Sequence, residues 1–524
     1  MATKTGPKAG GANSKGGRMP SDFPLRTGSD DSFRIVHSFL RDSGYTEAWL
    51  LERFELPSLH SLLYPLGQRG EEVRRRYQGP GTTPLIARLL MGGLAANIQE
   101  LDRRLPALVQ DAMRDLGLLT PMPDDPSRFF CPALVYPALD FFVAADRAVF
   151  LEGMPCYRGL DYVMSGAEDI CRDYIASLPD TSCGAFLEIG TGSGLGALCA
   201  SRTAGHVWAT DITSRAAGYA EFNRRLNLVS NVTVLQGDLF ASVETLKFDR
   251  ISCNPPFEPP LKHGHVFSVG GEDGEQIMRR VLESAPAHLN PGRRLYMQVM
   301  GTNREGDEFD ARIRRYLGSA AEECDIALFI RQRMEPREYA IHQILGDNED
   351  SWKLDEWSGF YKKLRALEVL HGHLVVQRAA ESRLVFHTVR SFGPHTNFAQ
   401  MEWLLDWETR STVPTHADLL YGSRPTAASG WRLDVRHAMR DGKLAAESYT
   451  LETKTPFEVE LAVEPWIAAM ASCCDGKRNA AELLDQVRSS GELPGEDGVA
   501  EFARVLHALV AHNILRLDGF QPPA

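Results

Sequence analysis

The chain has 524 residues, of which 43% are hydrophobic and 24% are charged, as is ordinary for a globular protein, and its length predicts two to four domains. The formal net charge of -12 excludes a protein that coats long nucleic acid with its whole surface, although a local basic groove remains compatible with it. No apolar run approaches the roughly 18 residues of a membrane span, so no membrane contact is expected.

The nine cysteines form no C-x-x-C pair, which argues against a zinc site, and no metal is expected. Free cysteines in this number fit a reducing compartment and predict a cytoplasmic protein. Residues 1–28 are predicted to be a disordered tail, because residues 1–20 are rich in Gly, Lys, Ser and Ala and lack the apolar block of a signal peptide. The alternative is a weak electrostatic contact with RNA through its basic residues, Lys4, Lys8, Lys15 and Arg18.

Residues 29–150 are predicted to form a helical, winged-helix-like module. Apolar residues recur at helical spacing over 30–118, and two strand-like runs follow at 134–136 and 141–143. Helices followed by a small ribbon suit either a module that docks the substrate or one that only caps the core. The pattern favours neither.

Residues 151–392 alternate between strand-like and helical segments. A helix is predicted over 164–177, and helical stretches lie between most of the strands. Such alternation predicts a parallel sheet that is covered on both faces. The predicted strands are 185–189, 207–211, 232–235, 248–253, 294–299, 326–330, 373–377 and 383–388.

A glycine-rich turn follows the first of these strands. Glycines there let the backbone turn sharply and approach a ligand, and the following helix begins with free N–H groups. A dinucleotide-binding fold uses a similar turn. Glu188, two residues before the first glycine, favours S-adenosylmethionine because its carboxylate can face the methionine ammonium, directly or through water. The turn contains Gly190, Gly192, Gly194 and Gly196.

The next two strands each lead to an acidic residue at the same expected edge of the sheet. Asp211 ends the second strand and can accept hydrogen bonds from ribose hydroxyls, which also suits NAD. Asp238 follows the third strand and can accept from the adenine amino group, while Leu239 or Phe240 packs on the ring. Three acids, each at the carboxyl end of consecutive parallel strands, predict one cofactor site where such sheets bind ligands.

The fourth strand ends in Asn254-Pro255-Pro256-Phe257, which predicts the methyl-acceptor site. The Asn254 side-chain oxygen and the Pro255 carbonyl can accept both N–H groups of a planar NH2, which directs the nitrogen lone pair at the methyl group. Two prolines stiffen this turn, and Phe257 can lie against a flat amide or base. Methyl transfer from a sulfonium is favourable, so positioning is expected to do most of the catalysis without a dedicated general base.

Two further segments lie outside this core pattern. Residues 335–368 form a connection that is longer than usual and is expected to shape the substrate side. Residues 393–524 are predicted to be an α+β, winged-helix-like accessory module, with helices from Pro465 and over 502–509 and a closing strand at 514–517. Between these two helices, Asn479 is expected to cap a further helix, with Glu482 as its reciprocal partner.

The motifs resemble class I S-adenosylmethionine-dependent methyltransferases, and more narrowly the HemK/PrmC-like amino-methyltransferases, which modify glutamine N5 or adenine N6. The resemblance is carried by residues 188–194, Asp211, Asp238 and 254–257, and by Gly270-Gly271-Glu272-Asp273-Gly274, which in the glutamine-modifying branch shapes the substrate loop. It implies a Rossmann-like, seven-stranded sheet and a helical N-terminal substrate domain. Phe257 stands where the release-factor branch usually has Tyr, and the 393–524 module lies outside the minimal enzyme.

The leading hypothesis is therefore an enzyme that methylates a planar amino nitrogen of a macromolecule, either a protein glutamine amide or a base amine of RNA or DNA. A base inside a helix would have to be flipped out to reach Asn254. The alternatives are a methyltransferase of a small metabolite or peptide, with 335–368 as a lid, and a noncatalytic scaffold. A group of arginines could form a local positive surface, with a solvated helix face as the other interpretation for 312–315. The group contains Arg312, Arg314, Arg315, Arg331 and Arg333.

Overall fold

The computed structural model describes residues 23–63, 70–261, 264–347, 353–413, 415–490, 498–518, 520 and 522–523. The chain divides into two compact units. The first contains Met1–Glu168 with two short later segments, Gly192–Leu195 and Gly218–Ser230. The second contains Asp169–Thr191, Gly196–Ala217 and Asn231–Ala524. Among the helices of the described residues, none has the length and apolarity that crossing a membrane requires.

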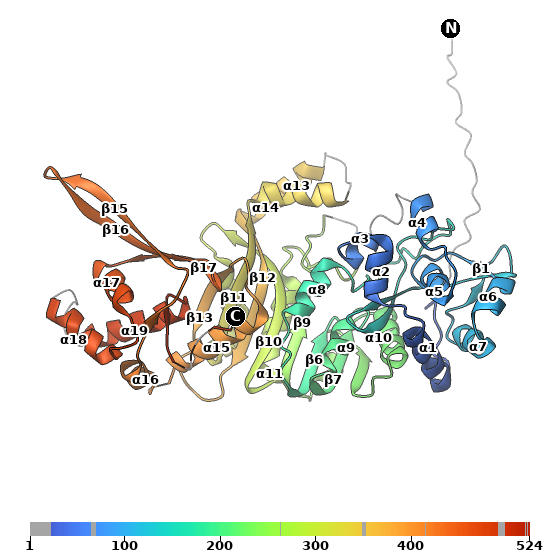
Figure 1. The fold of residues 1–524 in the computed structure, drawn as a ribbon, viewed down its shortest axis with the longest axis horizontal. Coiled ribbons are helices and arrows are strands. Elements are labelled where there is room, and N and C mark those ends of the chain that lie inside the picture. Colours follow the sequence, from blue (N-terminus) through green and yellow to red (C-terminus); the bar gives the residue numbers. More distant parts are fainter. Residues whose placement is uncertain are drawn as a thin grey trace, which may run out of the picture. The chain divides into compact units, whose positions relative to one another are not determined.

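The first unit is mostly helical, as its apolar periodicity predicts (Figure 1). Helix α1 begins where the Ser29 hydroxyl accepts a hydrogen bond from the Ser32 N–H, and it buries Phe33, Val36 and Leu40 on one face. The helices are α1 (Asp30–Asp42), α2 (Glu47–Phe54), α3 (Leu59–Leu63), α4 (Gly70–Arg76), α5 (Thr82–Leu90), α6 (Ile98–Arg104) and α7 (Ala107–Asp115).

Short strands complete this unit. A three-stranded sheet has the order β1-β3-β2, and the predicted ribbon is the antiparallel pair β4–β5. Of the predicted tail, residues 1–22 lie outside the described residues. The packed chain begins before residue 29, because Leu25 is buried and the Arg26 N–H donates to the Leu116 carbonyl. The strands are β1 (Ala96–Asn97), β2 (Thr120–Pro121), β3 (Arg128–Phe130), β4 (Leu134–Ala138) and β5 (Phe141–Ala145).

The second unit is built on one mixed sheet, which has eleven strands within the described residues, in the order β15-β16-β17-β13-β11-β12-β10-β9-β6-β7-β8. From β10 to β8 all neighbouring pairs are parallel, whereas β12 is antiparallel to β10 and β11. The strands of this parallel part and its neighbours are β6 (Cys183–Ile189), β7 (Ala204–Asp211), β8 (Val232–Gln236), β9 (Phe248–Cys253), β10 (Leu289–Arg304), β11 (Cys324–Met334), β12 (Ala366–Arg378) and β13 (His387–Phe392).

The sheet therefore has more strands than the seven that were predicted. Strand β13 pairs with β17 at Ser391↔Glu458 and Phe392↔Phe457, and this pairing extends the sheet into the C-terminal segment. The β15–β16 hairpin then projects as a long ribbon (Figure 1). Few of its residues are buried, and polar and apolar residues alternate only over short stretches such as 432–436, so the sequence gives a weak strand signal. The added strands are β15 (Arg432–Arg440), β16 (Lys443–Thr453) and β17 (Phe457–Val463).

Strand β13 begins four residues later than the predicted strand at 383–388. The reason is the buried carboxylate of Asp325, which binds the Arg383 guanidinium and accepts the Phe386 N–H at 3.0 Å. The segment before His387 is therefore held by a side chain rather than by the strand ladder. The predicted helix over 164–177 is observed as α8 (Asp169–Ala176).

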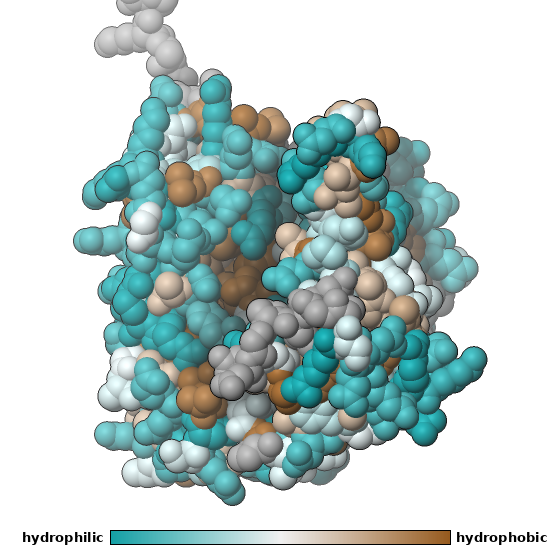
Figure 2. All heavy atoms as spheres, turned by 90° about the vertical axis from the view of Figure 1, so that its left-hand side faces the viewer, coloured by the Kyte–Doolittle hydropathy of each residue, from teal (hydrophilic) through white to brown (hydrophobic). Residues whose placement is uncertain are grey.

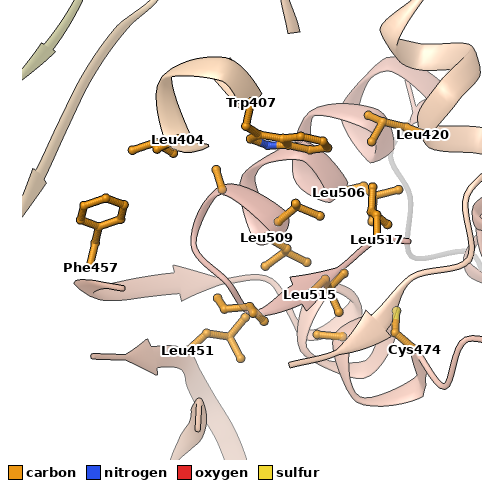
Figure 3. Close-up of a cluster of buried hydrophobic side chains, with 14 of the residues drawn as sticks. Leu404, Trp407, Leu420, Leu451, Phe457, Cys474, Leu506, Leu509, Leu515 and Leu517 are labelled. Carbon is orange, nitrogen blue, oxygen red and sulfur yellow. The ribbon is translucent and has the colours of Figure 1, made fainter. Parts of the chain in front are cut away.

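Apolar side chains cover both faces of the sheet. On one face, α11 (Gln276–His288) and α12 (Phe309–Tyr316) pack on residues such as Leu295, Val299 and Leu328. On the other, Tyr296, Phe329 and Val375 share a core with the C-terminal helices, in which Trp407, Leu506 and Leu515 are fully buried (Figure 3). Residues 393–524, predicted as an accessory module, thus complete the core on one face of the sheet.

Several predicted features of this segment are confirmed. Helix α17 (Pro465–Cys473) begins at the predicted proline, and α19 (Gly498–Ala511) buries Phe502, Leu506 and Leu509. Asn479 and Glu482 form the predicted reciprocal cap: the Glu482 N–H donates to the Asn479 side chain at 2.8 Å, and the Asn479 N–H donates to the Glu482 carboxylate at 2.9 Å. The closing strand is β18 (Leu515–Arg516), paired with β14 (Thr426–Ala427).

Two helices of the segment were not predicted: α15 (Phe398–Ser411) and α16 (His416–Gly422). The helix that Asn479 was expected to cap is observed as α18 (Ala480–Ser490). The molecular face drawn in Figure 2 is mostly hydrophilic, and its hydrophobic side chains form separate patches. Separate apolar side chains of this kind are normal on a protein surface.

Candidate functional site

The predicted site residues meet at the carboxyl edge of the parallel strands. The chain runs from β6 outward through β7 to β8 and then returns to the other side of β6 as β9. The point between β6 and β9, where the strand order reverses, is where open parallel sheets bind ligands. Ile189 pairs with both Cys253 and Thr210, so residues 190, 211 and 254 leave three neighbouring strands at one level.

The glycine-rich turn has the backbone that its composition predicts. Gly190, Gly192 and Gly194 have φ values of 70°, 55° and 82°, which residues with a side chain rarely adopt. A Cβ added at Gly190 or Gly192 would have no heavy atom within 4 Å, apart from its chain neighbours. The Gly190 N–H donates to the Thr210 carbonyl at 2.8 Å and fixes the turn to β7. The turn thus combines a fixed backbone with open space beside it, which fits a bound cofactor.

Glu188 lies beneath this turn rather than on the surface. Its carboxyl group is 3% exposed and accepts hydrogen bonds from the Thr191 hydroxyl and, at 3.5 Å, from the Tyr174 hydroxyl. Burial raises the pKa of Glu188 to about 7, and hydrogen bonds from Thr191, the Ala197 N–H and Tyr174 oppose that rise. A side chain at Gly196 would collide with the carboxylate, so this glycine makes room for it.

The two predicted aspartates are held differently. Asp211 accepts hydrogen bonds from the Thr213 N–H at 3.0 Å and the Thr213 hydroxyl at 3.2 Å, which orients its carboxylate at the end of β7. Asp238 forms an ion pair with Arg280 at 2.8 Å, and both side chains are almost half exposed. Such surface pairs contribute little free energy, so a ligand can replace Arg280 at low cost.

Leu239 and Phe240, the two candidates for packing on the adenine ring, differ in their surroundings. Leu239 has a φ of 51° and is partly buried against the sheet core. Phe240 is buried and stacks on His288 with ring centroids 4.3 Å apart. Since Phe240 is already stacked, Leu239 is the better candidate.

The Asn254–Phe257 turn follows the fully buried end of β9. The side-chain oxygen of Asn254 is buried and has no hydrogen-bond partner among the described residues. A buried acceptor without a partner costs about 1–3 kcal/mol, so a site that keeps one is expected to satisfy it with a ligand. Phe257 is partly buried and packs on a cluster that contains Met300, Tyr339 and Trp357.

The glycine segment at 270–274 packs directly on this turn. The Glu258 N–H donates to the Ser268 carbonyl at 2.7 Å, and the Gly270 N–H donates to the Glu258 carbonyl at 2.8 Å. A Cβ at Gly270 would lie 2.7 Å from both Phe257 Cα and the Pro256 carbonyl oxygen. A Cβ at Gly274 would lie 2.7 Å from the Phe257 carbonyl oxygen. These glycines allow backbone to press against the acceptor turn and fix its position.

The long connection at 335–368 lies beside the acceptor turn. It contains α13 (Pro336–Asp347) and α14 (Lys353–Leu364). Their aromatic residues Tyr339, Trp357 and Tyr361 are buried. The same cluster includes Phe257 and Leu261 from the segment after β9. The connection therefore contributes part of the wall on the acceptor side. Residues 348–352, in the middle of it, lie outside the described residues.

The arginines considered as a positive surface do not form one. Arg312 is buried and binds Glu275 through two hydrogen bonds of 3.0 and 2.8 Å. Arg314 donates to the carbonyls of Ala321 and Cys324 at 2.6 and 2.7 Å. Each of the other three pairs with a carboxylate: Arg315 with Asp307, Arg331 with Asp173, and Arg333 with Glu368. Among the described residues, no group of His, Cys, Asp and Glu side chains has a geometry for a metal ion.

The comparisons with known proteins agree with this site. Residues 171–309 match the family model "Methyltransferase small domain". The chain is 28% identical over 251 residues to the release factor glutamine methyltransferase of Moorella thermoacetica, which covers 44% of this chain and 83% of that protein. Residues 171–309 are therefore similar to methyltransferase domains. The predicted resemblance to HemK/PrmC-like, S-adenosylmethionine-dependent methyltransferases is confirmed.

Two further similarities have narrower coverage. The ribosomal protein uL3 glutamine methyltransferase of Bordetella pertussis is 28% identical over 187 residues, which are 31% of this chain and 62% of that protein. A solved methyltransferase from Pyrococcus furiosus is 20% identical, with a TM-score of 0.26, and covers 40% of this chain and 82% of that one. Each of these similarities covers less than half of this chain.

Some residues that shape the site were absent from the sequence prediction. Thr191 and Tyr174 hold the Glu188 carboxylate. Thr191 lies within the glycine-rich motif, but its contact with Glu188 was not predicted, and Tyr174 belongs to no spacing pattern that marks a site. Gln298 and His373 lie beside the acceptor turn in strands that were predicted only as core. A polar residue inside an apolar strand, as in Leu-Tyr-Met-Gln-Val-Met at 295–300, is the signal that could have found them.

Proposed function

We propose that the methyltransferase domain uses S-adenosylmethionine to methylate a planar amino nitrogen, and that this nitrogen is the side-chain amide of a protein glutamine. The buried, unpartnered oxygen of Asn254 at the switch point of the sheet carries the proposal. When bound, S-adenosylmethionine supplies an electrophilic sulfonium methyl group. Glu188, Gly190, Gly192, Gly194, Asp211, Asp238 and Leu239 are the residues that would hold it.

The acceptor turn contributes to catalysis by positioning the acceptor nitrogen. The Asn254 side-chain oxygen and the Pro255 carbonyl accept the two N–H groups of the acceptor, which directs the nitrogen lone pair. Pro255 and Pro256 stiffen the turn, and Phe257 packs against the flat acceptor group. The backbone at Gly270 and Gly274 packs closely against the turn. The nitrogen would take the methyl group as the bond from that group to the donor sulfur breaks, which leaves the nitrogen positively charged and acidic. It can then lose its proton to water, so a dedicated general base is unnecessary. Correct orientation alone contributes several orders of magnitude to such reactions.

The choice of a protein amide rests on the relatives. The similar proteins from Moorella and Bordetella are named as glutamine methyltransferases of a release factor and of ribosomal protein uL3. The five arginines proposed as a local positive surface are bound to carboxylates or carbonyls, so they lend no support to an RNA or DNA acceptor. A small metabolite or peptide acceptor and a noncatalytic scaffold are the other outcomes of the test below.

The flanking parts of the chain remain predictions within this proposal. We expect residues 29–150 to dock the macromolecular substrate, and residues 393–524 to support the sheet from one face. Their likeness to winged-helix modules and a cytoplasmic location are expected on sequence grounds alone.

The test compares Asn254→Ala with Asn290→Ala. Asn290 donates to Asp249 at the opposite end of the same strands, so its loss controls for removal of an asparagine from this sheet. We expect Asn254→Ala to transfer tritium from labelled S-adenosylmethionine to extract protein at least about 100-fold more slowly, because the nitrogen is no longer oriented. Asn290→Ala should keep the rate.

Calorimetry with S-adenosylmethionine separates the possible failures. Both variants should bind it as the unmodified protein does, since Asn254 faces the acceptor. Absence of binding by the unmodified protein would favour the scaffold. Equal labelling by Asn254→Ala would reject the acceptor turn as the site of catalysis.

A further inference from the structure

Strand β10 continues past the end of β9, beside the acceptor turn. The last β9–β10 pair is Cys253↔Met297, so Gln298 is the next residue along β10, level with Asn254 on the neighbouring strand. On its other side, Gln298 pairs with His373 of β12. Asn254, Gln298 and His373 therefore form a row across three adjacent strands, immediately beyond the carboxyl edge.

These side chains lie on the face of the sheet that carries Phe257. Residues that pair across strands point to the same face, and residues two apart along one strand share that face. Met300, two residues after Gln298, belongs to the apolar cluster on which Phe257 packs. Met300 pairs with His371, and the rings of His371 and Phe257 have centroids 6.3 Å apart. Gln298, His371 and His373 therefore lie next to the acceptor turn.

Besides the Asn254 side-chain oxygen, two polar atoms of this row have no hydrogen-bond partner among the described residues. Gln298 is 0% exposed and His373 is 4% exposed. The Gln298 side-chain nitrogen lies 2.9 Å from His371 Nε2, which uses one end of the amide. Among the described residues, the other end, Gln298 Oε1, and the ring nitrogen His373 Nδ1 have no hydrogen-bond partner. If the amide is turned over, its other end is left unpaired instead, so the conclusion is the same.

Unpartnered buried groups of this kind are rare in folded proteins, and each costs about 1–3 kcal/mol. Here two of them continue the row that begins with the unpartnered oxygen of Asn254. A chain that keeps such atoms together at the edge of a site retains them for a ligand rather than for stability.

The row is electrically neutral. Burial, together with the neighbouring His371 and Arg331, lowers the pKa of His373 to about 3. Burial and Arg331 also lower the pKa of His371, against the opposing effect of Asp173. Arg331 itself pairs with Asp173. Both rings are therefore neutral at pH 7, and the row offers no cation that would attract a phosphate.

We propose that Gln298 and His373 form a subsite that hydrogen-bonds an uncharged amide of the acceptor beside the group held by Asn254. The inference rests on the proposed function and deepens it, because it adds a second contact with the polypeptide that carries the glutamine. A peptide chain places a backbone amide within reach of a glutamine side chain. That amide has both a donor and an acceptor, so it can satisfy the unpartnered atoms of Gln298 and His373 together. Gln298 and His373 then determine specificity by orienting this second group.

The experiment compares Gln298→Leu with Gln377→Leu. Gln377 is also buried, on β12, but all its polar atoms are used: its oxygen accepts from Arg294 at 2.6 Å, and its nitrogen donates to Asp325 and Thr409 at 3.1 Å. The rate of tritium transfer into extract protein is measured against extract concentration, and stability is measured by urea unfolding of the full chain.

We expect Gln298→Leu to lower the apparent kcat/KM by about 5- to 150-fold, which corresponds to the loss of a hydrogen bond to a buried group. Its urea midpoint should fall much less than that of Gln377→Leu, since the change removes one unsatisfied atom and only one hydrogen bond, to His371. Gln377→Leu loses three hydrogen bonds and should have the lower midpoint, with an unchanged kcat/KM for the folded protein.

Three results would overturn the subsite: an unchanged kcat/KM in Gln298→Leu, a midpoint that falls as far as in Gln377→Leu, or label that nuclease removes and protease does not. Labelling by the unmodified protein tests the proposed function by itself, whereas the ratio between the variants tests the subsite. The two failures are therefore distinguishable.

Discussion

Two buried polar clusters of the second unit differ in how completely their hydrogen bonds are made. Around Glu275, the two carboxylate oxygens accept four bonds, of 3.0 and 2.8 Å from Arg312, 2.9 Å from Arg304 and 2.8 Å from the Tyr316 hydroxyl. In the row at the acceptor turn, Asn254, Gln298 and His373 each keep an atom without a partner among the described residues.

The difference separates a cluster that holds the fold from one that awaits a ligand. A buried ion network is tolerated only when its members are satisfied, because an isolated buried charge is costly. Unsatisfied neutral groups cost less, and a binding site recovers that cost when the ligand arrives. The first cluster should therefore respond to mutation in stability, and the second in activity.

The largest effect is expected for Glu275→Ala. The change leaves Arg312, a residue that is 3% exposed, with only the longer contact to Asp307, at 3.4 Å, as a carboxylate partner. Removal of one partner of a buried pair costs about 3–5 kcal/mol of unfolding free energy. Urea unfolding measures this loss, and a change below about 1 kcal/mol would contradict the assignment of Glu275 to the fold.

A smaller effect, on activity, is expected for Gly270→Ala. The added methyl group meets the backbone at Pro256 and Phe257 and displaces the acceptor turn. A displacement of this size should slow methyl transfer by about 100-fold while S-adenosylmethionine still binds. The control is Gly359→Ala in α14, where an added Cβ has no heavy atom within 4 Å outside its own helix backbone. A Gly270→Ala protein that is as active as the control would show that the glycine segment does not position the turn.

The smallest effect is expected in the pH dependence of cofactor binding. Burial raises the pKa of Glu188 to about 7, so its carboxylate becomes ionised in the folded protein only as the pH rises through 7. If the anionic form binds the methionine ammonium, directly or through water, affinity for S-adenosylmethionine should rise about tenfold between pH 6 and 8. Calorimetry at both pH values measures the rise.

The matched variant is Glu188→Gln, which should bind more weakly and lose this pH dependence. The same shift affects stability in the opposite direction. Because the folded pKa lies above the unfolded value of 4.5, the contribution of Glu188 to stability is present below pH 4.5 and is lost as the pH rises through 7. A pH dependence that persists in Glu188→Gln would assign it to another group.

The sequence predicts the strands and turns of the candidate site well, because their signals are local. An apolar strand that ends in Gly-x-Gly-x-Gly, and another that ends in Asn-Pro-Pro-Phe, identify β6 and β9 together with the turns that follow them. The reciprocal cap of Asn479 and Glu482 was predictable for the same reason. Each of these features depends on a few adjacent residues.

Features that depend on distant pairing were not predictable in the same way. The extension of the sheet by β17, β16 and β15 depends on one short contact with β13, and few of the hairpin residues are buried. From the sequence alone, Arg312 is expected at the surface. It is buried because the fold brings the Glu275 carboxylate against it. The Gln298–His373 pair exists only because β10 and β12 run side by side past the end of β9.

The most direct test of the account locates the transferred methyl group. The chain is incubated with cell extract and S-adenosylmethionine carrying a deuterated methyl group, and labelled peptides are sequenced by mass spectrometry. The account predicts the label on a side-chain amide nitrogen of glutamine, and none in reactions with Asn254→Ala. A label on a nucleic-acid base, or on an oxygen, sulfur or carbon atom of the protein acceptor, would contradict it.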